Sequence, residues 1–148
     1  MRIVVTCILS LALAATLAAA KSLALKDLPA AVQKTVQAEL KGGEIRNIDK
    51  ETEHRVVQYE VETMLNGKHR DFEVDATGKL LVVEEETSID TVPAPAKAAI
   101  LKKVGTGKLT LVETYQRGGE TLYEASYTTA AGRKREVLVK ADGTETKD

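Results

Sequence analysis

Four carboxylates placed around one tight turn are the side chains in this sequence whose types and spacing best suit chemistry. Glu60 and Glu62 alternate with apolar residues before the turn, and Asp71 and Glu73 do so after it. The turn, Asn66-Gly67, is a strong hairpin signal, because a type I′ turn needs positive φ at both central residues. The resulting register predicts that the four carboxylates lie on one face of a strand pair, with Glu62 opposite Asp71 and Glu60 opposite Glu73.

Three interpretations of this acidic face stay open. Like charges directly opposite each other destabilise a strand pair, so the stability of the sheet gives no reason to place them there. The face is a solvated surface that tolerates the repulsion, a contact surface for a basic protein, or a site for a hard cation such as calcium. Glu84-Glu85-Glu86, further along the chain, is interpreted as a solvated strand end.

The residues required for catalysis do not occur in a recognisable pattern. Serines at 22, 88 and 126 and histidines at 54 and 69 lie in no Gly-x-Ser-x-Gly motif and form no nucleophile–base pair in the sequence. Gly105-Thr106-Gly107-Lys108 lacks the first part of a phosphate-binding loop and is interpreted as a helix end. We therefore expect no enzyme activity, no catalytic residue and no cofactor.

The first twenty residues have the features of a secretory signal peptide. Arg2 is followed by an apolar run to Leu17 and by three alanines. Cleavage before Lys21 would leave 148 − 20 = 128 residues, with 21 − 1 = 20 basic and 22 acidic residues and no cysteine. We expect a periplasmic or secreted protein that does not bind nucleic acid and does not associate with the membrane after cleavage.

The rest of the chain contains an internal repeat, which shows how the carboxylates are positioned. The pattern of Leu28-Pro29 recurs as Val92-Pro93, a shift of 64 residues, and Gly78 recurs as Gly143, a shift of 65. Within each copy, an apolar stripe at helical spacing precedes alternating strand patterns. The sequence therefore predicts an α+β fold of two tandem repeats, each a helix packed on a three- or four-stranded antiparallel meander sheet.

The boundaries follow from this repeat. We expect a signal peptide over 1–20, a first repeat over 21–88, a linker over 89–95 and a second repeat over 96–148, whose helix starts near residue 92. Whether the two sheets join, and the oligomeric state, are left open by the sequence. Leu122 and Leu138 fall on the outer face of the second repeat, where they mark either a contact between repeats or a patch for a partner.

The repeat resembles the PepSY and PepSY-like families. The matching residues of the first copy are Tyr59, Glu60, Val61, Gly67, Phe72, Glu73, Val74, Asp75 and Gly78. The second copy keeps Tyr123, Glu124, Gly132, Glu136, Val137, Val139 and Gly143, but has Lys140 in the position of Asp75.

The tandem arrangement is similar to that of the β-lactamase-inhibitor proteins, whose two repeats make a concave protein-binding surface. The resemblance implies a non-enzymatic module that binds a protein or peptide partner, or inhibits a peptidase, and it supplies no catalytic residue. A cation-binding envelope sensor and a purely structural envelope protein are the alternatives. The candidate partner-binding residues are Glu60, Glu62, Asp71, Glu73, Leu122 and Leu138, and the first four are also the candidate cation site.

Overall fold

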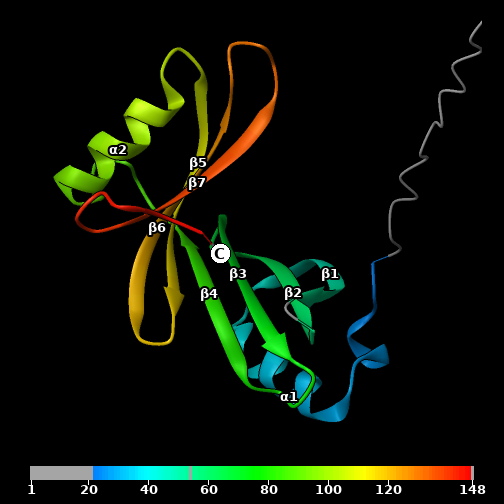
Figure 1. Cartoon of the computed structure of the whole chain (residues 1–148). Coiled ribbons are helices and arrows are strands. Elements are labelled where there is room, and N and C mark those ends of the chain that lie inside the picture. Colours follow the sequence, from blue (N-terminus) through cyan, green and yellow to red (C-terminus); the bar gives the residue numbers. More distant parts are fainter. Residues whose placement is uncertain (1–21, 54, 148) are drawn as a thin grey trace, which may run out of the picture.

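A computed structural model describes residues 22–53 and 55–147 of the chain (Figure 1). The predicted signal peptide, 1–20, and His54 lie outside the described residues. Within the described part, no helix is long and apolar enough to cross a membrane.

The described residues form two α-helices, a short 3₁₀ helix and eight strands. The first half contains η1 (Leu25–Asp27), α1 (Ala30–Glu39), β1 (Glu44–Glu53), β2 (Val56–Leu65), β3 (Lys68–Asp75) and β4 (Leu80–Glu86). The second half contains α2 (Ala94–Val104), β5 (Lys108–Arg117), β6 (Glu120–Thr128), β7 (Lys134–Lys140) and β8 (Glu145–Thr146).

The eight strands form one continuous antiparallel sheet in the order β1 to β8. The predicted fold class, two tandem repeats that each have a helix on a three- or four-stranded sheet, is therefore wrong, because one eight-stranded sheet runs through both halves. β4 pairs directly with β5, from Val82 opposite Arg117 to Glu86 opposite Glu113. A separate first sheet would have left the backbone N–H and C=O groups of β4 unpaired at an exposed edge, and β5 satisfies them.

The spacing of the elements follows the shift seen in the sequence. α2, β5 and β6 begin at residues 94, 108 and 120, which are 64 residues after the starts of α1, β1 and β2 at 30, 44 and 56. Figure 1 shows α1 beside β1–β4 and α2 beside β5–β8. The sequence shift thus identified the order of the elements, but not the pairing that unites them.

The register deduced from the sequence for the first hairpin is confirmed, since Glu60 lies opposite Glu73. Val61 lies opposite Phe72, and Ala125 lies opposite Val137. In the first turn Asn66 and Gly67 have φ values of 54° and 80°, as a type I′ turn requires. The side chains of each pair therefore share a face of the sheet, so the strand pairing assigns each residue to one of the two faces.

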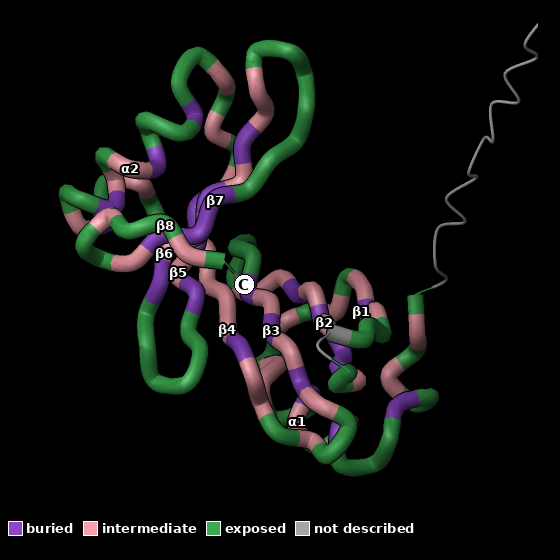
Figure 2. The backbone as a smooth tube through the Cα atoms, viewed as in Figure 1, coloured by how far each residue is buried: buried purple, intermediate pink, exposed green. Residues whose placement is uncertain are grey.

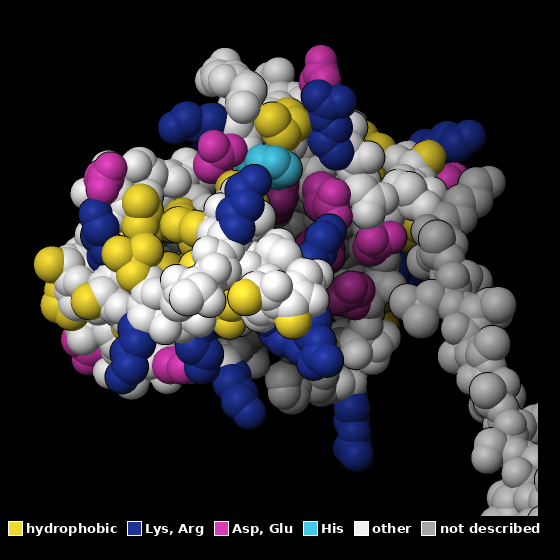
Figure 3. Space-filling view, turned by 90° about the horizontal axis from the view of Figure 1, so that it is seen from above, with side chains coloured by type: hydrophobic (Ala, Val, Ile, Leu, Met, Phe, Trp, Pro, Cys, Tyr) yellow, Lys and Arg dark blue, Asp and Glu magenta, His cyan; other side chains and the backbone are white. Residues whose placement is uncertain are grey.

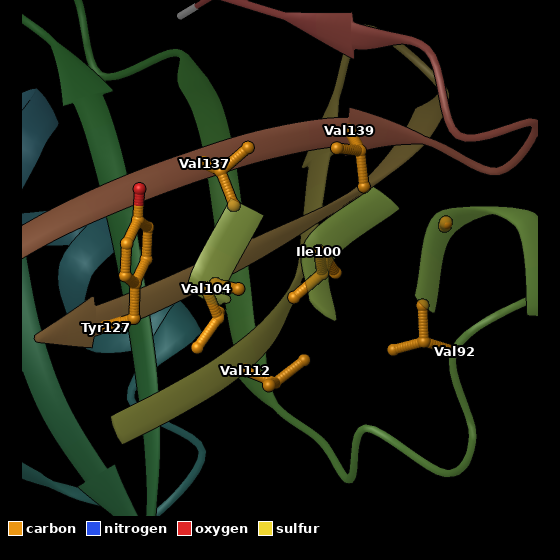
Figure 4. Close-up of a cluster of buried hydrophobic side chains, with 9 residues drawn as sticks. Val92, Ile100, Val104, Val112, Tyr127, Val137 and Val139 are labelled. Carbon is orange, nitrogen blue, oxygen red and sulfur yellow. The ribbon is translucent and has the colours of Figure 1, made fainter. Parts of the chain in front are cut away.

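Both helices cover the same face of the sheet. Val32 and Val36 of α1 pack against Val61 and Phe72 of the strands, and all four are buried. Under α2 lies a second cluster, made up of Val92, Ala96, Ile100, Val104, Val112, Ala125, Tyr127, Val137 and Val139 (Figure 4). Buried segments accordingly follow the strands and one side of each helix (Figure 2). We call the opposite side of the sheet, which neither α1 nor α2 covers, the outer face.

Arg70 connects α1 to the strands on the helix-covered side. Its guanidinium donates to a carboxylate oxygen of Glu39 at 2.7 Å and to one of Glu85 at 3.0 Å. Arg70 is only 4% exposed. Its charge is thus used on the helix side and does not neutralise the outer face.

Candidate functional site

The outer face contains a hollow of about 360 Å³. It is lined by nine carboxylates together with His69, Leu111 and Ser126. The carboxylates are those of Glu51, Glu60, Glu62, Asp71, Glu73, Glu84, Glu113, Glu124 and Glu136. No lysine or arginine is among the described lining residues. Figure 3 shows acidic side chains, some of them recessed, gathered next to a histidine. We call this set the acidic hollow.

Three of these carboxylates lie closest together, one from each of β3, β4 and β5. Asp71, Glu84 and Glu113 each offer a carboxylate oxygen, and these atoms all lie within 4.8 Å of one another. The strand pairing explains this placement, because Asp71 lies opposite Glu84 and Glu113 lies opposite Glu86, two residues further along β4. The junction of β4 with β5 therefore assembles the centre of the acidic hollow.

The members of this central group differ in their hydrogen bonds and in their burial. A carboxylate oxygen of Asp71 accepts a hydrogen bond from the backbone N–H of Thr63 at 2.7 Å, which fixes the side chain. Glu113 is only 4% exposed, and its Oε1 has no hydrogen-bond partner among the described residues. An unsatisfied buried polar group costs about 1–3 kcal/mol, and more if it is charged. Glu113 is therefore the polar group of the acidic hollow that lacks compensation.

Burial and mutual repulsion raise the pKa values of these acids. Burial, followed by the charges of Glu124, Glu113, Asp71 and Glu73, raises the pKa of Glu84 to about 9. Burial, followed by the charges of Asp71 and other acidic neighbours, raises the pKa of Glu113 to about 7. Burial also raises the pKa of Glu60 to about 7 and that of Asp71 above its ordinary value. The face therefore favours either protons or positively charged groups.

All four carboxylates singled out in the sequence, Glu60, Glu62, Asp71 and Glu73, line the acidic hollow. Sequence reasoning missed Glu84, which was interpreted as a solvated strand end but is partly buried among acids. It also missed Glu113, Glu124 and Glu136 as members of this face. The alternation of β5, β6 and β7 was available as a signal, but it locates these residues here only once β5 is paired with β4.

Leu122 and Leu138 lie on the outer face as predicted, but they are buried, at 2% and 6% exposed. With Val82 and Tyr115 they form an apolar cluster, which we call the seam cluster. It joins β4 from the first half to β5, β6 and β7 from the second. Of the two interpretations from the sequence, contact between the halves fits this burial, and the two leucines present little surface to a partner.

Comparisons with known proteins identify the fold. No family model matches the chain, and neither does any curated protein. A solved structure from Bacteroides eggerthii, described as a "putative periplasmic" protein, aligns with a TM-score of 0.60 and 14% identity, covering 81% of this chain and 86% of that one. A DUF2874 family protein from Bacteroides uniformis aligns with a TM-score of 0.60 and 15% identity, covering 80% and 86%.

A BLIP-like protein from Bacteroides fragilis aligns with a TM-score of 0.53 and 18% identity, covering 80% of this chain and 84% of that one. None of these three structures is described as a PepSY protein, so the PepSY resemblance stays one of sequence motifs. At such identities the likeness concerns the fold alone. The chain therefore shares the fold of DUF2874 family and BLIP-like proteins.

Proposed function

We propose that this chain is an exported, non-enzymatic binding module whose outer face holds a basic segment of a protein or peptide. The observation that carries the proposal is the acidic hollow itself, nine carboxylates with no described lysine or arginine lining it. Lysine and arginine side chains of a partner would supply the missing charge, and charge complementarity of this kind steers association and selects partners.

The shape of the face supports a macromolecular partner. Both described α-helices lie on the other side of the sheet, and the acidic hollow draws residues from β1 to β7. A short basic segment crossing these strands would meet carboxylates along its length. The β-lactamase-inhibitor arrangement, to which the sequence repeat is similar, uses a concave surface in this way, and one structural neighbour is described as BLIP-like.

The chemistry of the acidic hollow supports a binding role over catalysis. Ser126 lines the hollow, and its hydroxyl donates a hydrogen bond to a carboxylate oxygen of Glu136 at 3.4 Å. Export is part of the proposal, supported by the predicted signal peptide and by the periplasmic description of one neighbour. Inhibition of a peptidase is the specific activity that the PepSY resemblance suggests for such a module.

The test uses a defined probe. A fluorescent decapeptide of mixed lysine and arginine is titrated with the protein, purified from cells that express the full-length gene, and binding is followed by anisotropy. An acidic peptide of equal length serves as the comparison. We expect the basic peptide to bind, the acidic peptide not to bind, and the affinity to fall as the salt concentration rises.

Two charge-matched double variants locate the binding surface. Glu62→Gln with Glu136→Gln removes two carboxylates from the acidic hollow, outside its central group, and we expect about a tenfold loss of affinity. Asp27→Asn with Asp90→Asn removes two exposed carboxylates that lie outside the sheet, and we expect little change. Equal losses in the two variants, or no binding by the unmodified protein, would contradict the proposal.

A further inference from the structure

We infer that Asp71, Glu84 and Glu113 form a calcium site at the junction of the two halves of the sheet. The three residues come from neighbouring strands, and each contributes an oxygen to a group whose atoms lie within 4.8 Å of one another. This site is distinct from the four carboxylates predicted in the sequence, of which only Asp71 is a member. It also stands independently of the proposed peptide-binding function.

Glu113 is the observation that points to a ligand rather than to a chance gathering of acids. Its side chain is buried, and its Oε1 lies without a hydrogen-bond partner in the described part of the chain. The backbone around it is fixed by pairing on both sides, with Glu86 on β4 and with Glu124 on β6. A buried carboxylate held in this way needs a positive group close by, or it costs the fold stability.

Among the described residues, the charges that act on Glu113 come from Asp71, Glu124, Glu86 and Glu136, and all of them are acidic. His69 also lines the acidic hollow, but a positive charge on it acts on Asp71. Arg70, next to Asp71 on β3, directs its guanidinium to Glu39 and Glu85 on the helix-covered side. A bound divalent cation would satisfy Glu113 and relieve its repulsion with Asp71 and Glu84 at the same time.

The donor set selects a hard cation. All three ligands are carboxylates, and oxygen ligands are those that calcium and magnesium prefer. Calcium binds oxygen at about 2.3–2.6 Å and magnesium at about 2.0–2.1 Å, so oxygens on opposite sides of the ion lie about 4.6–5.2 Å apart for calcium and about 4.0–4.2 Å for magnesium. Oxygens that all lie within 4.8 Å of one another can be reached by either ion, and the number of carboxylates favours calcium, because magnesium usually takes only one or two together with water. Three carboxylates provide up to six oxygens, and water would complete the shell.

Terbium luminescence provides a readout specific to this place. Terbium is a hard trivalent ion that replaces calcium and emits when an adjacent tyrosine is excited. The chain has four tyrosines and no tryptophan. Tyr115 lies directly opposite Glu84 in the β4–β5 pairing and therefore on the same face. Tyr59, Tyr123 and Tyr127 lie with the buried residues under the helices.

The experiment uses protein from the full-length gene, treated with EDTA and then freed of it. We expect one calcium ion per chain by isothermal titration calorimetry and a terbium emission that calcium competes away. Tyr115→Phe should abolish most of that emission with calcium affinity unchanged. Tyr123→Phe, the matched control, should leave the emission unchanged. Magnesium should compete at least about tenfold more weakly than calcium.

Carboxylate variants distinguish a specific calcium site from a general electrostatic attraction of calcium to the acidic hollow. Glu113→Gln and Glu84→Gln should each lower calcium affinity by about tenfold or more. Glu136→Gln, an exposed carboxylate of the same acidic hollow, should change it less than about twofold. Should Glu113→Gln fail to fold by circular dichroism, Glu84→Gln and Asp71→Asn carry the same test.

Absence of calcium binding at millimolar calcium would overturn the inference, and so would an equal loss in Glu136→Gln, which would show a diffuse ion atmosphere. Terbium emission that persists in Tyr115→Phe would contradict the placement of the cation site next to Tyr115. These outcomes are separate from those of the peptide experiment, which alters Glu62 and Glu136 and leaves all three inferred ligands in place.

Discussion

Glu84 on β4 lies directly opposite Tyr115 on β5. The glutamate lines the acidic hollow, whereas the tyrosine belongs to the seam cluster. Both side chains lie on the outer face, so the same strand pairing completes the acidic centre and buries the apolar side chains beside it. Because the two depend on one junction, the stability of the seam and the integrity of the candidate site are coupled.

The first prediction concerns the seam cluster. Leu122→Ala should lower the free energy of unfolding by about 2–4 kcal/mol, because a side chain only 2% exposed is replaced by a cavity. Urea denaturation followed by circular dichroism measures this change. Leu101→Ala on α2, where the side chain is 46% exposed, should change it by less than about 0.5 kcal/mol.

A small effect of Leu122→Ala, similar to that of Leu101→Ala, would mean that Leu122 is not packed between the halves. The hypothesis of a partner patch at Leu122 would then have to be considered again. A reduced calcium affinity in Leu122→Ala, with all carboxylates intact, would in turn support the coupling between the seam and the acidic centre.

The second prediction concerns Arg70, which is 4% exposed and bound to Glu39 and Glu85. Arg70→Met should lower the free energy of unfolding by about 2–3 kcal/mol, because it removes the buried guanidinium that two carboxylates share. The loss is smaller than for a fully buried pair, since the side chains of Glu39 and Glu85 are 22% and 46% exposed. Urea denaturation at neutral pH measures it.

The exposed pair between Lys140 and Glu120, with a nitrogen–oxygen distance of 3.1 Å, provides the comparison for Arg70. Lys140→Met should change the free energy of unfolding by less than about 1 kcal/mol. If the two methionine variants were equally stable, the Arg70 contacts would contribute no more than a surface ion pair.

The third prediction concerns Glu60 and pH. Burial, then repulsion from Glu51, Glu62, Asp49 and Asp71, raises its pKa from 4.5 to about 7. The folded state therefore binds the proton more tightly than the unfolded state does. The stability from this group is fully present below pH 4.5 and is lost as the pH rises through about 7.

Glu60→Gln keeps this position neutral at every pH. At about pH 8 it should be more stable than the unmodified protein by about 1 kcal/mol, a value reduced for the partial exposure of the side chain. The difference should shrink as the pH falls towards 4.5. Thermal unfolding in EDTA across this range measures it, and Glu44→Gln, an exposed carboxylate, should leave the pH profile unchanged. A difference that did not vary with pH would contradict the assignment.

The parts of the fold that the sequence revealed depend on local signals. Asn66-Gly67 determined the register of β2 with β3, since turn geometry and alternation act over a few residues. The constant shift between Leu28-Pro29 and Val92-Pro93 located the second helix by comparison with the first. The four carboxylates of the first hairpin were found for the same reason.

The parts that were missed depend on a contact between distant segments. β4 ends at Glu86 and β5 starts at Lys108, with α2 between them, so no turn signal specifies their pairing. Without that pairing, Glu84 is interpreted as part of a solvated strand end, and nothing brings Glu113 close to it. Leu122 and Leu138, two apolar residues on a face expected to be exposed to solvent, were the signal of this junction in the sequence. The sequence alone allowed them to be either a contact between the repeats or a patch for a partner.

The fourth prediction concerns Gly78, in the turn between β3 and β4. Its φ is +87°, and a Cβ there would lie 2.7 Å from the carbonyl oxygen of Ala31 on α1. Gly143, its counterpart in the second half, has a φ of +86° and the same 2.7 Å approach to the carbonyl oxygen of Pro95 on α2. In both halves, then, a glycine turn lies against the first turns of the helix.

Gly78→Ala should lower the free energy of unfolding by about 2–4 kcal/mol, because a left-handed backbone conformation costs a non-glycine residue about 1–2 kcal/mol and the clash with α1 adds to it. Gly67→Ala isolates the first of these costs, since Gly67 has a φ of +80° and no atom within 4 Å of the added Cβ. It should cost only about 1 kcal/mol. Urea denaturation of both variants measures the difference, and equal losses would show that α1 does not press on the turn.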